Sequence, residues 1–213
     1  MIALYRSLSV LVLLPALGGL PDARAQIPEK FENLQVLPKD IAQAHKEVEV
    51  FVRERMRGYL AERGYSATEI EAVLSRLFVR LDQIPRQLDA VRAFARLPEA
   101  PSLAAANKRI ANILREAGEV PGEFDAALFS QDEEKALAGA FTAVQPGFEQ
   151  AYKAGDYSAA LQSLAALKGP VDAFFDKVLV MDPDEGLRRN RVGFLGKLHA
   201  TMNRIADLAK LAA

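Results

Sequence analysis

The sequence has no cysteine, and its 213 residues include only two histidines, His45 and His199. Without cysteine the chain has no disulfides, zinc–thiolate sites, c-type haem attachment or thiol nucleophiles. The two histidines lie far apart in the sequence, so nothing favours a two-histidine metal site. The sequence also has no glycine-rich phosphate loop, no usefully spaced Ser/His/Asp set and no His-Glu-x-x-His pattern. No active site is recognisable, and whether the chain belongs to an enzyme stays open at this point.

The charge of the chain is nearly balanced, with a formal net charge of −1 at pH 7. This balance excludes attraction of the whole molecule to nucleic acid or to acidic membranes, so any such binding needs a local patch. Residues 184–213 offer one, because six Lys or Arg residues face three Asp or Glu residues there. Asp172 and Asp176, one helical turn apart, could hold a metal ion. The alternative is that Asp172 serves a helix N-terminus and that Asp176 pairs with Arg188 or Arg191.

Residues 1–25 have the pattern of a secretory signal peptide. A positively charged start is followed by an apolar run over residues 8–20, and Ala23 and Ala25 are the small residues expected before a cleavage site. The apolar run is shorter than the ~20 residues needed to span a bilayer, so we expect no membrane contact after removal of the signal. The alternative is an apolar N-terminal helix that docks on the domain.

After a predicted linker over residues 26–39, apolar residues recur at helical spacing almost to the end of the chain. No run of alternating β-branched residues predicts a strand. We therefore predict an all-α helical bundle, with one helical segment over residues 40–120 and a second over residues 121–213. The first helix is expected to bury a stripe that includes Val48, Phe51 and Tyr59.

Local signals predict several helix boundaries. Ser66 to Glu69 and Ser130 to Glu133 have the spacing of capping boxes. Ser102 is predicted to cap the following helix, which Gly118 ends. Pro146 predicts a kink or break, and the last helix is expected to run from Asp184 to near Leu211.

Several blocks of the sequence resemble the C-terminal part of the bacterial glycyl-tRNA synthetase β subunit. They are RMRGYLAERGYS (Arg55–Ser66), LPEAPSLAAANKR (Leu97–Arg109), LAAANKRIANIL (Leu103–Leu114), PVDAFFDKVLVM (Pro170–Met181) and LRRNRVGFLGKL (Leu187–Leu198). Their order and separation match that family from about residue 48 to residue 211. The resemblance implies a helical anticodon-binding domain of the DALR type, which is shared with arginyl-tRNA synthetases. It assigns this domain to residues 121–213 and the region before it to residues 40–120. A shorter stretch, residues 30–41, resembles the segment before the haem motif of exported c-type cytochromes, but the required cysteines are absent.

The resemblance implies that the domain holds a glycine tRNA by its anticodon stem-loop, while a separate α subunit activates glycine. The chain would then be non-catalytic alone and would bind no cofactor, although the complete enzyme uses ATP and Mg²⁺. The matching blocks place the candidate RNA-binding residues at Asn107, Lys108, Arg109, Asn112, Arg188, Asn190 and Arg191. The alternatives from the residues alone are a solvated basic rim, and amides at Asn107 and Asn112 that bond to a neighbouring backbone or side chain.

Two expectations about stability follow from this interpretation. Replacing Arg188 and Arg191 together by alanine should leave the thermal midpoint nearly unchanged, because both are taken as surface residues. Phe174 and Phe175 are interpreted as core residues in preference to stacking platforms for bases, so Phe174→Ala should destabilise the fold by ~3–5 kcal/mol.

The resemblance and the N-terminus point to different compartments. A tRNA-binding module belongs in the cytoplasm, whereas a signal peptide indicates export. The alternative function is therefore that of an exported helical bundle with a structural or interaction role, in which the RNA-binding surface is vestigial.

Overall fold

The computed structural model describes residues 41–76, 81–118 and 122–212. The chain divides into two units, Met1–Val52 and Arg53–Ala213. The predicted signal peptide and linker lie outside the described residues, and the described part of the first unit is the first half of helix α2.

The described residues form helices and no strand, which confirms the predicted all-α fold. The α-helices are α2 (Ile41–Glu62), α3 (Ala67–Leu74), α4 (Ile84–Ala95), α5 (Ala100–Ala117), α6 (Asp132–Ala154), α7 (Tyr157–Ser163), α8 (Lys168–Lys177) and α9 (Glu185–Met202). Short 3-10 helices occur at η2 (Leu81–Gln83), η3 (Ala126–Leu128), η4 (Leu164–Leu167) and η5 (Leu208–Leu211). None of the described helices is both long and apolar enough to cross a membrane.

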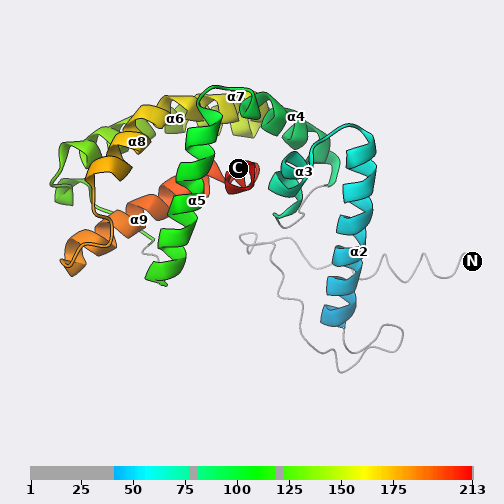
Figure 1. Ribbon diagram of the computed structural model, residues 1–213, viewed down its shortest axis with the longest axis horizontal. Coiled ribbons are helices and arrows are strands. Elements are labelled where there is room, and N and C mark those ends of the chain that lie inside the picture. Colours follow the sequence, from blue (N-terminus) through cyan, green and yellow to red (C-terminus); the bar gives the residue numbers. More distant parts are fainter. Residues whose placement is uncertain (1–40, 77–80, 119–121, 213) are drawn as a thin grey trace, which may run out of the picture. The chain divides into compact units, whose positions relative to one another are not determined.

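Within the second unit, α5 is the central element. It packs against α8, α9 and the C-terminal turn η5, which lies between α3 and α5 (Figure 1). Helix α6 packs along α7 and α8, and α7 also contacts α4. One buried hydrophobic cluster joins these helices and takes residues from both sides of position 120. The boundary predicted at residue 120 therefore does not coincide with a break in the core.

Several predicted helix ends agree with the structure. Ser66 and Glu69 form the predicted capping box of α3, with the Ser66 backbone N–H donating to Glu69 Oε2 at 2.7 Å. Gly118 ends α5 with φ of +72°, a backbone conformation that glycine adopts without a Cβ clash. Asp184 caps α9 by accepting a hydrogen bond from the Leu187 N–H at 2.9 Å.

Two predicted caps are wrong. Helix α5 begins at Ala100, and Ser102 lies inside its first turn, where its hydroxyl donates to Asp172 Oδ1 at 2.5 Å. Pro101 suits that first turn because a backbone N–H there would have no helical partner, and proline has none. The second capping box lies one residue later than predicted, because Glu134, and not Glu133, accepts the Gln131 backbone N–H at 2.9 Å.

Helix α6 continues through Pro146, contrary to the predicted kink or break. Pro146 lies on the exposed side of the helix, where water can bond to the carbonyl that loses its helical partner. The predicted inward stripe of α2 is also wrong in part, because Val48, Phe51 and Tyr59 are exposed.

The last helix ends nine residues earlier than predicted, at Met202. Asn203 holds the following turn, because its side-chain oxygen accepts the Leu208 backbone N–H at 2.9 Å. The Asp207 N–H then donates to the carbonyl of Ala72 in α3 at 2.7 Å. These hydrogen bonds return the C-terminus to the core, where η5 buries Leu208.

Candidate nucleic-acid interface

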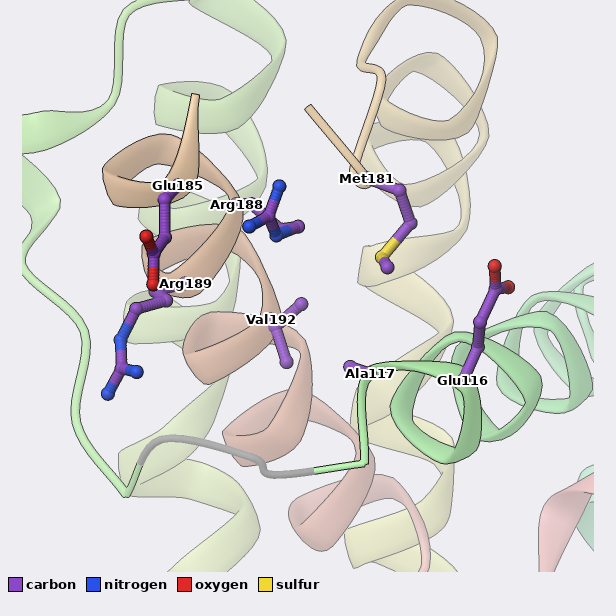
Figure 2. Close-up of a pocket in the computed structure, with 7 residues that line it drawn as sticks. All are labelled: Glu116, Ala117, Met181, Glu185, Arg188, Arg189 and Val192. Atoms are coloured by element: carbon purple, nitrogen blue, oxygen red, sulfur yellow. The ribbon is translucent and has the colours of Figure 1, made fainter. Parts of the chain in front are cut away.

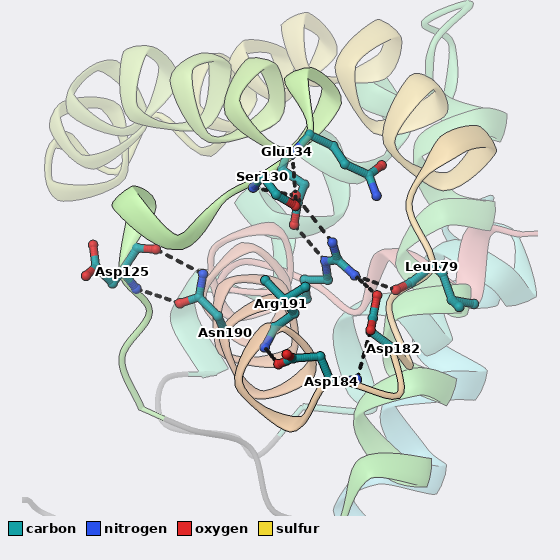
Figure 3. A network of polar contacts seen from close by, with 10 residues as sticks. Asp125, Ser130, Glu134, Leu179, Asp182, Asp184, Asn190 and Arg191 are labelled. Carbon is teal, nitrogen blue, oxygen red and sulfur yellow. Dashed lines mark hydrogen bonds and ion pairs between the residues drawn. The ribbon is translucent and has the colours of Figure 1, made fainter.

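Arg191 of α9 is at the centre of a buried polar network (Figure 3). Its side chain is only 1% exposed, as is that of Glu134 in α6, and Arg191 Nε donates to Glu134 Oε1 at 2.7 Å. Arg191 Nη1 donates to Asp182 Oδ2 at 2.8 Å and to the carbonyl of Leu179 at 2.9 Å. The guanidinium therefore connects α6, α9 and the segment between α8 and α9.

This network is electrically balanced inside the fold. Burial is the largest influence on the pKa of Glu134 and acts to raise it, because a low-dielectric environment disfavours the charged carboxylate. Hydrogen bonds from Arg191 and from the backbone N–H groups of Gln131 and Ser130 together outweigh burial, so the pKa of Glu134 is lowered. The pair is therefore charged at neutral pH.

Two candidate asparagines are also buried and bonded within the chain. Asn190 Oδ1 accepts the Asp125 backbone N–H at 2.7 Å, and its Nδ2 donates to the Asp125 carbonyl at 2.9 Å. Asn107 is fully buried and exchanges two hydrogen bonds with Asn203, at 2.8 and 3.0 Å. Asn190 thus fixes the segment before α6 on α9, and Asn107 fixes the C-terminal turn on α5.

These contacts separate the seven candidate residues into two groups. Asn107, Asn190 and Arg191 have their polar groups engaged inside the protein and present none of them to solvent. The burial of Arg191 contradicts the expectation that alanine at positions 188 and 191 leaves the thermal midpoint nearly unchanged. Lys108, Arg109, Asn112 and Arg188 remain on the surface or partly exposed.

Three of the four surface residues form a polar row on α5. Arg109 and Asn112, three positions apart, point to one side of the helix, with Lys108 beside them. The Arg109 guanidinium lies 4.4 Å from the centroid of the Phe175 ring in α8, and Asn112 Oδ1 accepts a hydrogen bond from Arg115 at 2.9 Å. The row continues to Glu116 in the last turn of α5 and leads to a cleft.

The cleft has a volume of about 240 Å³ and lies between the end of α5 and the start of α9 (Figure 2). It is lined by Glu116, Ala117, Met181, Glu185, Arg188, Arg189 and Val192. Arg188, the fourth surface candidate, is held there because its Nη1 donates to the Asp182 carbonyl at 2.8 Å. The α5 row and the cleft together bring cations, amides, carboxylates and apolar side chains onto one surface.

Asp172, one of the two aspartates considered as a metal pair, is bonded to other side chains. Asp172 accepts from Ser102 and pairs with Lys168 at 3.0 Å. Arg191 pairs with Glu134 and Asp182, and not with Asp176. Across the described ranges, no group of three or more His, Asp or Glu side chains is arranged to hold a metal ion.

Comparison with known sequences decides the family. Residues 103–213 match the DALR anticodon binding domain. The chain belongs to the DALR anticodon-binding domain family. The match includes α9 and all of α5 after its first three residues, and therefore all seven candidate residues and the cleft.

Known relatives agree with this membership. The chain is 53% identical to the glycine--tRNA ligase beta subunit of Thiobacillus denitrificans over 81% of its length, and 54% identical to that of Leptothrix cholodnii over 76%. It is 43% identical to the same subunit of Ralstonia nicotianae over 206 residues, or 97% of the chain. The resemblance read from the sequence is thereby confirmed. The chain spans only about a quarter of the length of these relatives.

The structure adds surface residues to those that the sequence patterns predicted. Arg115 and Arg189 are exposed beside the predicted residues, and Glu116, Glu185 and Met181 line the cleft. Arg189 belongs to the same cationic run as Arg188, and Arg115 follows Asn112 by three positions, so helical spacing could have found both. The cleft members come from segments about 65 residues apart, and no local pattern connects them.

Proposed function

We propose that this chain binds the anticodon arm of a glycine tRNA as the C-terminal part of a glycine--tRNA ligase beta subunit. The observation that carries the proposal is the coincidence of the DALR match over residues 103–213 with the α5 row and the cleft. The names of the relatives supply the choice of glycine tRNA.

The surface chemistry supports RNA as the ligand. Single-stranded RNA loops are bound by Lys and Arg contacts to phosphates and by amides, arginine planes and apolar side chains that meet unstacked bases. Lys108, Arg109 and Arg115 supply phosphate contacts along α5, and Asn112 supplies an amide. The near-zero net charge predicts weak binding by this chain alone, with the rest of the ligase adding strength through effective concentration.

In this proposal the chain performs no catalysis by itself. The α subunit would activate glycine with ATP and Mg²⁺, and this chain would contribute by holding the tRNA. No cofactor is needed for that role, because the binding groups are the side chains of α5 and α9.

Salt dependence tests the proposal. Binding of the full chain to an RNA hairpin with a glycine tRNA anticodon arm, measured by fluorescence anisotropy, should be micromolar or weaker and should decline as salt rises. Lys108→Ala with Arg109→Ala should weaken binding and reduce the slope of log K against log salt by about 0.7–0.9 for each lost phosphate contact. The matched control, Lys135→Ala with Lys153→Ala, removes the same charge from exposed positions on α6 and should keep the slope. Absence of binding at every salt concentration would refute the proposal.

We also propose a cytoplasmic location, where tRNA is found. The Ralstonia nicotianae relative supports it, because a match over 206 of 213 residues extends through most of the predicted signal peptide and linker. Expression of the full chain in bacteria, followed by cell fractionation and N-terminal sequencing, should recover Met1 in the cytosol. A mature N-terminus at Gln26 in the periplasm would favour the exported bundle instead.

A further inference from the structure

The cleft differs in charge from the row on α5. Its lining contains two arginines, Arg188 and Arg189, and two glutamates, Glu116 and Glu185, so its formal charge is zero. Within the described residues the carboxylates of both glutamates are exposed and form no ion pair or hydrogen bond. By contrast Lys108, Arg109 and Arg115 give the neighbouring surface of α5 an excess of positive charge. The two surfaces therefore suit different parts of one ligand.

The cleft is poorly suited to a phosphate. Two carboxylates on its lining would repel an anion at short range. The N-terminus of α9, which would otherwise attract an anion, is already occupied by the Asp184 cap and carries Glu185 in its first turn. Met181 and Ala117, both partly exposed, add apolar surface that a phosphate cannot use.

A single nucleobase fits the same features. A base has flat apolar faces, and its edge carries hydrogen-bond acceptors that arginine can bind and amino groups that glutamate can bind. Figure 2 shows Arg188, Met181 and Val192 around the middle of the cleft and Arg189 directed away from it. The hydrogen bond from Arg188 to the Asp182 carbonyl fixes the guanidinium in place, leaving its other donors free for a ligand. At about 240 Å³ the cleft is below the roughly 300–1,000 Å³ of pockets for drug-sized ligands, which suits one base and not several.

We propose that this cleft receives one unpaired base of the bound RNA loop. Arg188 donates to an acceptor on the base edge, Glu116 or Glu185 accepts from an amino group, and Met181 with Ala117 contacts the face of the base. The backbone phosphates on either side of this base lie along Lys108, Arg109 and Arg115. The inference rests on the proposed RNA-binding function. In it, the cleft is the part of the binding surface that recognises one particular loop nucleotide.

An abasic scan of the anticodon-arm hairpin tests this assignment. Each loop nucleotide is replaced in turn by an abasic residue, and anisotropy is measured with the unmodified chain and with Arg188→Gln. With the unmodified chain, an abasic residue at one loop position should lower the affinity roughly 10-fold, which is the scale of a good arginine–base contact. With Arg188→Gln, the affinity for the intact hairpin should fall by a similar factor. An abasic residue at that loop position should then lower the affinity of this variant no further. The slope of log K against log salt should stay unchanged, because a base contact releases no counterion from a phosphate.

The matched control is Lys135→Gln, which makes the same charge change at an exposed position of α6 outside the cleft and the α5 row. The RNA affinity of this control should stay within about 3-fold of that of the unmodified chain, because surface substitutions away from a site have small effects. The same loop position should remain the one at which an abasic residue weakens binding. Glu116→Gln provides a second variant, because an uncharged residue at the C-terminal end of α5 removes an unfavourable dipole contact and preserves folding. With Glu116→Gln, an abasic residue at the same loop position should cause a smaller loss of affinity than it does with the unmodified chain. Thermal melts confirm that each variant is folded.

The outcomes separate the two proposals. If the unmodified chain binds no RNA, the proposed function itself fails. The chain could also bind RNA with the expected salt dependence while the Arg188 and Glu116 variants change the effect of no abasic position. Only the cleft assignment is then overturned. A decreased salt slope for Arg188→Gln would also overturn it, because Arg188 would then contact a phosphate.

Discussion

Arg191→Ala is expected to lower the free energy of unfolding by about 3–5 kcal/mol, the cost of leaving a buried charge without its partner. The substitution leaves the Glu134 carboxylate, 1% exposed, without its two guanidinium contacts. It also removes the donors to Asp182 and to the Leu179 carbonyl. Urea denaturation followed by circular dichroism measures the loss.

Neighbouring substitutions show whether burial is the cause. Arg189→Ala removes the same charge from an exposed position two residues earlier and should change stability by no more than about 0.5 kcal/mol. The double variant Arg191→Met with Glu134→Leu replaces both charges by apolar side chains and should recover most of the loss, because such replacements are often neutral or stabilising. Equal, small effects of Arg191→Ala and Arg189→Ala would show that the network contributes nothing to stability.

The same ion pair determines part of the acid sensitivity. The pKa of Glu134 is lowered in the folded state, so its contribution is present above the pKa of an unfolded glutamate, roughly 4.3. That contribution is lost as the pH falls through the lower folded-state pKa. The unfolding free energy of the unmodified chain should therefore decline below about pH 4.3, whereas Arg191→Met with Glu134→Leu should show a shallower decline.

Local signals in the sequence determine much of the secondary structure, because caps and helix ends depend on near neighbours. The capping box at Ser66 and Glu69, the helix end at Gly118 and the cap at Asp184 are all formed by residues within three or four positions. The misplaced end of α9 has a distant cause. Asn203 ends α9 through its bonds with Asn107, 96 residues away.

The candidate site was less predictable for the same reason. A run of arginines in α9 favours a basic surface, but α9 is buried nearly all round over residues 190–195. Arg191 points inward because Glu134, 57 residues earlier, offers a carboxylate in the core. From sequence, Glu134 is recognisable only as an acidic residue in a first helical turn. Spacing identifies Arg188 and Arg191 as candidates, but only the position of α6 distinguishes the surface residue from the internal one.

Phe174→Ala is expected to destabilise the domain by about 3–5 kcal/mol, as other large-to-small changes at fully buried aromatic positions do. Phe174 is fully buried in α8, among the residues of the hydrophobic cluster. Its ring contacts that of Phe175 edge-to-face, with centroids 5.4 Å apart. Removal of the ring therefore costs apolar burial, leaves a cavity and loses an aromatic contact. Chemical denaturation measures the effect, and RNA affinity per folded molecule should stay unchanged.

Phe175→Ala is the matched control, because the neighbouring ring is only partly buried and has the Arg109 guanidinium on its face. It should cost less than half as much stability, since a partly exposed cation–π contact contributes about 0.5–1 kcal/mol and less apolar area is lost. Phe175 instead positions Arg109 on the α5 row, so this variant should weaken RNA binding while the domain stays folded. If Phe174→Ala left the domain stable but weakened RNA binding, Phe174 would be a base-contacting residue, and its assignment to the core would be wrong.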